Sequence, residues 1–114
     1  MPKDDRVYLG HMKDAAAKAV GKVKGLSREA FDADENLRLA LAHLIPIVGE
    51  AARRVSDGTR SLHSEIPWSE IIGMRHKVVH DCFGVDWDLV WDVVSHDLPP
   101  LVAALAPLVF SKNG

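Results

Sequence analysis

The sequence lacks several features that would place it in familiar classes of protein. It contains one cysteine, Cys82, which excludes an internal disulfide and suits a reducing compartment. Its formal net charge is −2, so nonspecific attraction to phosphate is excluded as its main function, and any contact with nucleic acid must be local. No apolar run approaches the length of a membrane span, and residues 1–5 are too polar for a signal peptide. We therefore expect a cytoplasmic protein with no membrane partner.

Common catalytic motifs are also missing. The sequence has no GxSxG turn, no phosphate-binding loop and no glycine-rich dinucleotide turn. His76 and His80, four residues apart and followed by Asp81 and Cys82, form a partial set of metal ligands. However, Lys77 stands where an HExxH motif has its glutamate, and no second cluster of ligands occurs. We expect neither a cofactor nor a metal, and metal binding stays a minor alternative.

What the sequence does contain is a helical pattern throughout. Its 114 residues, nearly half of them apolar, suffice for a single domain, 1–114, with a sizeable core. Apolar residues recur every three or four positions, and we expect no strand. The predicted helices cover residues 4–24, 27–31, 32–55 and 67–84. A capping box of Asp32 and Glu35 opens the third of them. Asp86 caps a further helix, and a last helix over residues 101–110 follows a restart at Asp97. The predicted fold class is all-α, an antiparallel four- to five-helix bundle.

Arg75 has an unusual place in the predicted helix over residues 68–83. At about 100° per residue, the apolar side chains of this helix gather in one broad arc, and Arg75 falls near its middle. A guanidinium on a core-facing stripe destabilises a fold by several kcal/mol unless a carboxylate, carbonyl groups or a bound anion meet it. Arg75 is therefore the leading candidate for a functional residue.

A second set of residues flanks this arc on the same projection. Ser69, Gly73, His76 and His80 form a narrow strip in which small residues alternate with imidazoles, so we expect a groove with titratable walls. Arg75 and His80 are five residues apart, about 140° around an ideal helix. One helix cannot aim both side chains at one atom. They converge only if Arg75 uses its long stem or a second copy of the helix supplies the other half.

The three tryptophans have a plainer interpretation. Trp68, Trp87 and Trp91 recur at helical spacing. Such residues anchor a core or a dimer interface much more often than they stack on bases, and we predict that packing role. Their indole N–H groups then need hydrogen-bond acceptors.

Several blocks of the sequence form a recognisable set. They are residues 66–75 (IPWSEIIGMR), 80–86 (HDCFGVD), 90–91 (VW) and 97–101 (DLPPL), with 48–52 (VGEAA) and 8–12 (YLGHM) upstream. Together they resemble the HepT-like branch of the HEPN superfamily over nearly the whole chain. The resemblance implies an all-α bundle that forms dimers and, in many members, a metal-independent endoribonuclease. Such proteins often act as the toxin of a toxin–antitoxin pair whose antitoxin is a small nucleotidyltransferase.

The resemblance also implies roles for particular residues. The arginine–histidine motif of the family maps onto Arg75 and His80, and the polar residue that follows the arginine is His76. An imidazole titrates near neutrality, so His80 can accept or donate the protons of RNA cleavage. Arg75 can hold the phosphate and offset charge in the transition state. In a homodimer the motif occurs twice in one cleft, and RNA is the expected substrate.

The chain departs from the family pattern at one position. The motif commonly continues with a tyrosine two residues after the histidine, and this chain has Cys82 there. In paired systems that tyrosine can be modified with AMP to silence the toxin. Cys82 has no phenol, and the single tyrosine, Tyr8, lies in another helix. Control by AMP modification is thus not predicted for this chain, and Cys82 is only a possible regulatory position.

Three further residues complete the predicted site, namely Glu50, Ser69 and Asp81. Glu50 lies on the second long helix, in a block that matches the family, and two interpretations are equally open. In the first, it pairs with Arg75 or orders the cleft. In the second, it forms a surface pair with Arg54 at a four-residue spacing.

Two classes of function remain open. The first is a cytoplasmic, dimeric, metal-independent ribonuclease of toxin type. The second is a catalytically silent HEPN module that binds a nucleotidyltransferase, a nucleotide or RNA without cutting it, because a fold does not determine a function.

Overall fold

The computed structural model describes residues 2–80 and 84–110, with no side chain described for His80 or Phe110. Nearly all of this part is helical, and the prediction of an all-α bundle is confirmed. The elements are α1 (Lys3–Val23), α2 (Arg28–Ala33), α3 (Glu35–Arg54), α4 (Asp57–Leu62), α5 (Trp68–Ile72), α6 (Met74–Val78), β1 (Val79–His80), β2 (Gly84–Val85), α7 (Trp87–Asp92), the π-helical turn η1 (Val93–Asp97) and α8 (Leu98–Phe110).

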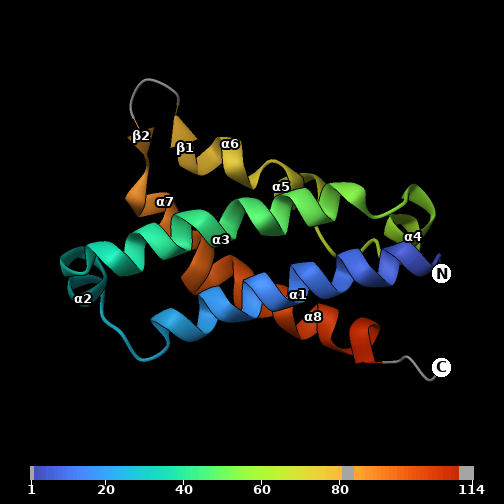
Figure 1. The fold of residues 1–114 in the computed structure, drawn as a ribbon, viewed down its shortest axis with the longest axis horizontal. Helices are drawn as coiled ribbons and strands as arrows, with labels where there is room; N and C mark the ends of the chain where they lie inside the picture. Colours follow the sequence, from blue (N-terminus) through green and yellow to red (C-terminus); the bar gives the residue numbers. More distant parts are fainter. Residues whose placement is uncertain (1, 81–83, 111–114) are drawn as a thin grey trace.

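The long helices lie side by side and share one core (Figure 1). α1 packs between α3 and α8, and the α5–α6 segment covers the other side of α3. On α1 the buried positions recur every three or four residues, as predicted, and several are alanine, which lets the neighbouring helices approach closely. The fully buried residues include Leu9, Met12, Ala16, Ala19, Leu41, Ile45, Val48, Val90, Val94, Leu98 and Leu105.

Short polar side chains set where the helices begin. The carboxylate of Asp34 accepts a hydrogen bond from the Leu37 amide and caps α3, so the predicted capping box opened by Asp32 is wrong. Asp32 instead belongs to α2 and pairs with Arg28. Ser56 caps α4, a helix that the predicted elements do not include. The predicted cap at Asp86 is confirmed.

A buried carboxylate fastens the start of α1 to the start of α4. Asp5 is only 3% exposed, and its oxygens accept hydrogen bonds from the Ser56 amide (2.9 Å), the Ser56 hydroxyl (2.6 Å) and the Thr59 hydroxyl (2.5 Å). Burial alone raises the pKa of the Asp5 carboxyl, but the hydrogen bonds from Ser56 and Thr59 outweigh it and hold the pKa below its usual value of 3.8. Folding therefore stabilises the ionised form of the Asp5 carboxyl group.

The segment after Trp68 differs most from the prediction. A single helix over residues 68–83 is wrong, because the chain breaks at Gly73 into α5 and α6 and then becomes extended. β1 and β2 form an antiparallel pair in which Val79 lies opposite Val85 and His80 opposite Gly84. The expectation of no strand is thus also wrong. Two adjacent β-branched residues, Val78 and Val79, favour the extended backbone there, and Gly84 takes a positive φ of 78°.

The last helical stretch is continuous from Trp87 into α8, so a restart at Asp97 is wrong. The π-helical turn η1 joins the two predicted helices, and the Leu98 amide bonds to the Val93 carbonyl five residues back. Pro99 and Pro100 have no N–H to donate, and the wider turn accommodates that loss. By length and composition alone, the helical stretch Trp87–Val109 is long and apolar enough to span a membrane, so the expectation that no apolar run approaches the length of a membrane span is wrong. In this structure, one face of the stretch packs on α1.

Candidate functional site

Arg75 is exposed, and the prediction of a core-facing guanidinium is wrong. The buried face of α5 and α6 runs through Ile71, Met74 and Val78 at helical spacing, and the chain becomes extended at Val79. Arg75, His76 and Lys77 therefore face outward. In the described part of the chain, the side chain of Arg75 makes no ion pair or hydrogen bond with another residue, while its backbone carbonyl accepts from the Val79 amide. Among the described residues nothing neutralises this cation, and it lies at the surface where an external anion can reach it.

Arg75 lines a surface groove of about 720 Å³ that three helices build. α3 forms the floor, α1 contributes one wall, and α6 contributes Arg75 to the other. Pro46 lies in the floor and has no N–H to give to the carbonyl of Ala42, which therefore lacks the usual helical hydrogen bond. The remaining lining residues are Tyr8, His11, His43, Ile47, Glu50, Ala51 and Arg54. The groove is thus rich in cations and titratable rings.

The two ends of the groove differ in chemistry. α1 runs antiparallel to α3 (Figure 1), and Asp5 contacts Ser56 just beyond the end of α3. Tyr8 accordingly lies near Arg54. The α5–α6 segment also runs antiparallel to α3, with Ile71 against Gly49. Arg75, one turn further along, therefore lies toward the half of α3 that carries His43. One end of the groove thus carries Arg75 and His43, and the other end carries Tyr8 and Arg54.

Glu50 lies in the groove but does not pair with Arg75. Its carboxylate binds Arg53 through two contacts of 3.2 and 2.7 Å, and Arg54 through one of 3.0 Å. The hydrogen bond from Arg53, followed by the one from Arg54, holds the pKa of Glu50 below its ordinary value. Of the two interpretations of Glu50, the pair with Arg75 is wrong and the surface pair with Arg54 is confirmed. Glu50 therefore does not neutralise the charge of Arg75.

The predicted strip of Ser69, Gly73, His76 and His80 does not form the groove. Ser69 lines a separate surface depression with Trp68 and Ser64, and the exposed His76 does not line the groove. The backbone of His80 is in β1, while its side chain, Asp81 and Cys82 lie outside the described residues. The structure thus separates Arg75, on a helix, from His80, on a strand. The angular objection drawn from a single helix no longer applies.

The described residues contain no preformed metal site. Among them, no three histidine, cysteine or acidic side chains are grouped so that they could hold an ion. The set proposed from the sequence consists of His76, His80, Asp81 and Cys82, most of which lies outside the described side chains.

Tyr8 belongs to the groove, and sequence reasoning set it aside because it is far from the motif. Its ring lies 6.3 Å from the His11 ring, edge to face, and the Arg54 guanidinium carbon is 6.0 Å from its centroid. The spacing of Tyr8 and His11 on one helix was a visible signal of a shared face. Their proximity to Arg75 was not visible, because Tyr8 and Arg75 are 67 positions apart in the sequence.

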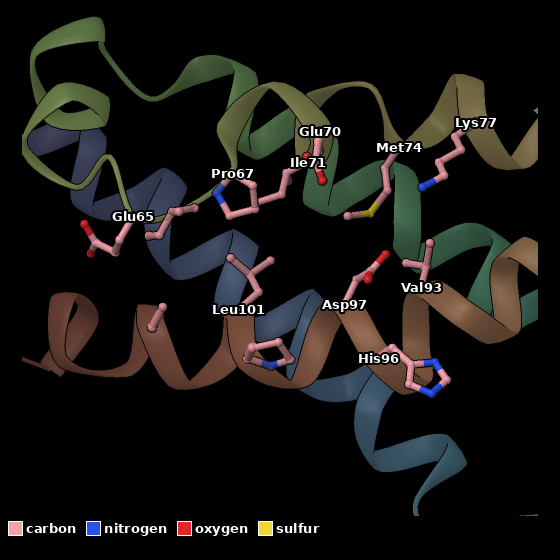
Figure 2. A pocket seen from close by; sticks show the side chains of 13 residues that line it. Glu65, Pro67, Glu70, Ile71, Met74, Lys77, Val93, His96, Asp97 and Leu101 are labelled. Atoms are coloured by element: carbon pink, nitrogen blue, oxygen red, sulfur yellow. The ribbon is translucent and has the colours of Figure 1, made fainter.

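A second cavity lies on the opposite side of α6 and has the opposite character. It encloses about 300 Å³ between α5–α6 and the η1–α8 turn, over an apolar floor that includes Ile71, Met74 and Leu101. Figure 2 shows Asp97 and Lys77 reaching towards it from opposite walls, with Glu65 and Glu70 nearby. Three carboxylates against one lysine repel phosphate. The α1–α3–α6 groove is therefore the better anion site of these two.

The fold and groove define a small helical bundle with an exposed arginine placed to bind an anion. The family model described as "Ribonuclease HepT-like" matches residues 12–108, and the chain belongs to this family. The resemblance drawn from the sequence is thereby confirmed. Membership supports ribonuclease function as the general activity of the chain.

Known proteins agree with this assignment. The chain is 36% identical over 99 residues to "Putative RNase TTE0752" of Caldanaerobacter subterraneus subsp. tengcongensis, covering 87% of this chain and 88% of the relative. It is 32% identical over 101 residues to "Probable ribonuclease HepT" of Thermococcus cleftensis, covering 89% of this chain and 92% of the relative. No solved structure matches the chain.

Proposed function

We propose that this protein is a metal-independent endoribonuclease in which Arg75 and His80 form a composite site across a homodimer. The observation that carries the proposal is the exposed Arg75 on the wall of a groove in a HepT-like protein, with no described side chain paired to it. A cation without a carboxylate partner is free to bind phosphate. The family motif places His80 five residues later, which supports its role beside Arg75.

The chemistry follows from the two side chains. His80 of one subunit takes the proton of the ribose 2′-hydroxyl, whose oxygen then attacks the adjacent phosphorus. The bond from phosphorus to the 5′-oxygen breaks, and His80 of the second subunit gives that oxygen a proton. Arg75 holds the phosphate and stabilises the negative charge that builds on its oxygens in the transition state. His76, on the same helix as Arg75, is a supporting residue in this scheme.

Apolar side chains around the groove support a dimer at this face. Val7 on α1 and Leu39 and Ile47 on α3 are 48%, 55% and 37% exposed. Ile47 lines the groove, Leu39 lies two helical turns from Ile47, and Val7 lies one turn from the groove residue His11. Exposed apolar side chains beside a groove offer area on which a second copy of the chain can pack. A two-fold pairing here would bring two Arg75 residues towards one cleft.

The toxin role rests on the family resemblance. We infer a cytoplasmic protein that cleaves cellular RNA and is silenced by a nucleotidyltransferase antitoxin. Expression of the chain alone should arrest bacterial growth, and the Arg75→Ala variant should not. If cells that make soluble wild-type protein grow as well as cells that carry the empty vector, this role is contradicted.

The cleavage test compares the wild type with two variants in EDTA. Arg75→Ala and His80→Ala should each lose cleavage of single-stranded RNA by a factor of about 100 or more. Lys77→Ala is the matched control for charge, because Lys77 lies on α6 with Arg75 but lines the other cavity. His96→Ala, on the η1 turn, is the control for the imidazole. Equal cleavage by all variants would reject the assigned roles, and cleavage only with added zinc or manganese would favour a metal mechanism.

The silent binding module remains the competing function. Cys82 in place of the family tyrosine is the observation that favours it, because a phenol that helped to hold the substrate would be missing. RNA binding without cleavage in the wild type would support this function.

A further inference from the structure

The Tyr8 end of the groove combines an aromatic ring with a cation. Tyr8 is half-buried, and its ring borders the groove between His11 on the same helix and Arg54 on α3. The carboxylate of Glu50 holds the Arg54 side chain at 3.0 Å, so the guanidinium stays near the ring. This arrangement presents one flat, apolar surface beside a positive charge. Together the two groups suit an unpaired base and the phosphate next to it.

The Tyr8 end lies apart from Arg75 along the groove. The floor extends over α3 from Ala42 to Arg54, which is about 18 Å at 1.5 Å per residue. A single phosphate held at Arg75 leaves the rest of that length unoccupied. The next part of a polynucleotide strand would therefore lie along α3 and reach Tyr8. A base paired within a duplex cannot stack on a protein ring, so the strand must be single.

We infer that Tyr8 and Arg54 form a subsite for single-stranded RNA, in which a base further along the strand from the cleaved phosphodiester stacks on the Tyr8 ring. The inference rests on the proposed function, since it takes RNA as the ligand held at Arg75. It adds a residue that binds substrate and a preference for unpaired RNA over duplex. Glu50 positions Arg54 in this subsite.

Binding measured without cleavage tests the subsite. The full chain carrying His80→Ala is titrated in EDTA against a fluorescein-labelled single-stranded RNA, and anisotropy reports the affinity at several salt concentrations. Tyr8→Leu should weaken binding about 5- to 100-fold, whereas Tyr8→Phe should keep wild-type affinity, because stacking needs only the ring. The slope of affinity against salt should not change in Tyr8→Leu, since no phosphate contact is removed. Leu62→Ala, at an exposed apolar position on α4, is the control.

A second variant guards against a folding defect, because Tyr8 also packs against the core. Arg54→Gln changes an exposed side chain; it should weaken binding and reduce the salt slope by about 0.7, the value for one phosphate contact on a single strand. The stacking subsite would be overturned if Tyr8→Leu bound RNA as tightly as the His80→Ala chain without it. It would also be overturned if Tyr8→Leu and Tyr8→Phe lost the same amount of affinity. An unaltered salt slope in Arg54→Gln would overturn the assignment of Arg54 to it.

The outcomes separate this inference from the proposed function. If the wild type does not cut RNA but binding depends on the Tyr8 ring, cleavage is rejected and the subsite stands. If the wild type cuts RNA but its affinity for RNA does not depend on the Tyr8 ring, the subsite alone is rejected.

Discussion

A β-carbon added at Gly49 would lie 3.0 Å from the carbonyl oxygen of Ile71, so α3 and α5 touch backbone to backbone at this point. The contact sets how closely α5 and the following α6 approach α3. Arg75 is four residues beyond Ile71, and its place on the groove wall depends on that approach. A glycine far from Arg75 in sequence thus positions the candidate phosphate ligand.

Gly49→Ala should therefore weaken both stability and activity. The methyl group forces α5 outward, and overpacking of this kind destabilises a fold by about 1–3 kcal/mol. RNA cleavage should fall along with the melting temperature, because Arg75 shifts with α6. Gly21→Ala on α1 is the control, since its new β-carbon meets nothing within 4 Å and should stabilise the helix by about 0.5–1 kcal/mol. A Gly49→Ala protein as stable and active as the wild type would show that the contact is unimportant.

Asp5→Asn should destabilise the fold at neutral pH by about 1–3 kcal/mol, because a buried charge-assisted network is lost. The pKa of Asp5 is lowered by folding, so its ionised form contributes stability at pH values above 3.8, the usual pKa. That contribution disappears as pH falls through the lower pKa of the folded state.

Urea unfolding at a series of pH values checks this dependence. The difference between wild type and Asp5→Asn should be constant from neutrality to mildly acidic pH and should narrow below 3.8. Asp4→Asn, an exposed neighbour, should show almost no difference at any pH. A gap between wild type and Asp5→Asn that widens on acidification would contradict the assignment.

Glu50→Gln should raise the affinity for single-stranded RNA and steepen its salt dependence. Glu50 neutralises part of the charge of Arg53 and Arg54, and its amide analogue removes the negative charge from the groove. Fluorescence anisotropy at several salt concentrations measures both effects, with Glu29→Gln on α2 as the control. Weaker binding or lost cleavage in Glu50→Gln would mean that the ordering of Arg54 by Glu50 outweighs the charge.

Ile47→Lys should convert the proposed dimer into a monomer and abolish cleavage that needs two subunits. A lysine at the centre of an apolar interface would be buried without a partner. Light scattering coupled to size exclusion measures the mass, and Leu62→Lys, at a 75% exposed position on α4, should leave the dimer intact. A wild type that is monomeric while cutting RNA would reject the composite site.

The helical bundle could be predicted from the sequence because its signals are local. The spacing of Leu41, Val48 and Val55, the cap at Asp86 and the arginine–histidine motif all depend on neighbours a few residues away. Local signals failed where tertiary contacts compete with helix propensity. The break at Gly73, the pairing of Val79 with Val85 and the π-helical turn before Pro99 all lie where other elements pack against the chain.

Periodicity was enough to predict the helical fold class and most of the core, and motif spacing was enough to select Arg75 as a candidate, because these patterns are written along the chain itself. The exposure of Arg75, the pairing of Glu50 with Arg53 and Arg54, and the presence of Tyr8 in the same groove became visible only in three dimensions. They depend on a groove that is assembled from three helices distant in sequence. The packing of α1 and α6 against α3, including the close contact at Gly49, brings those helices together.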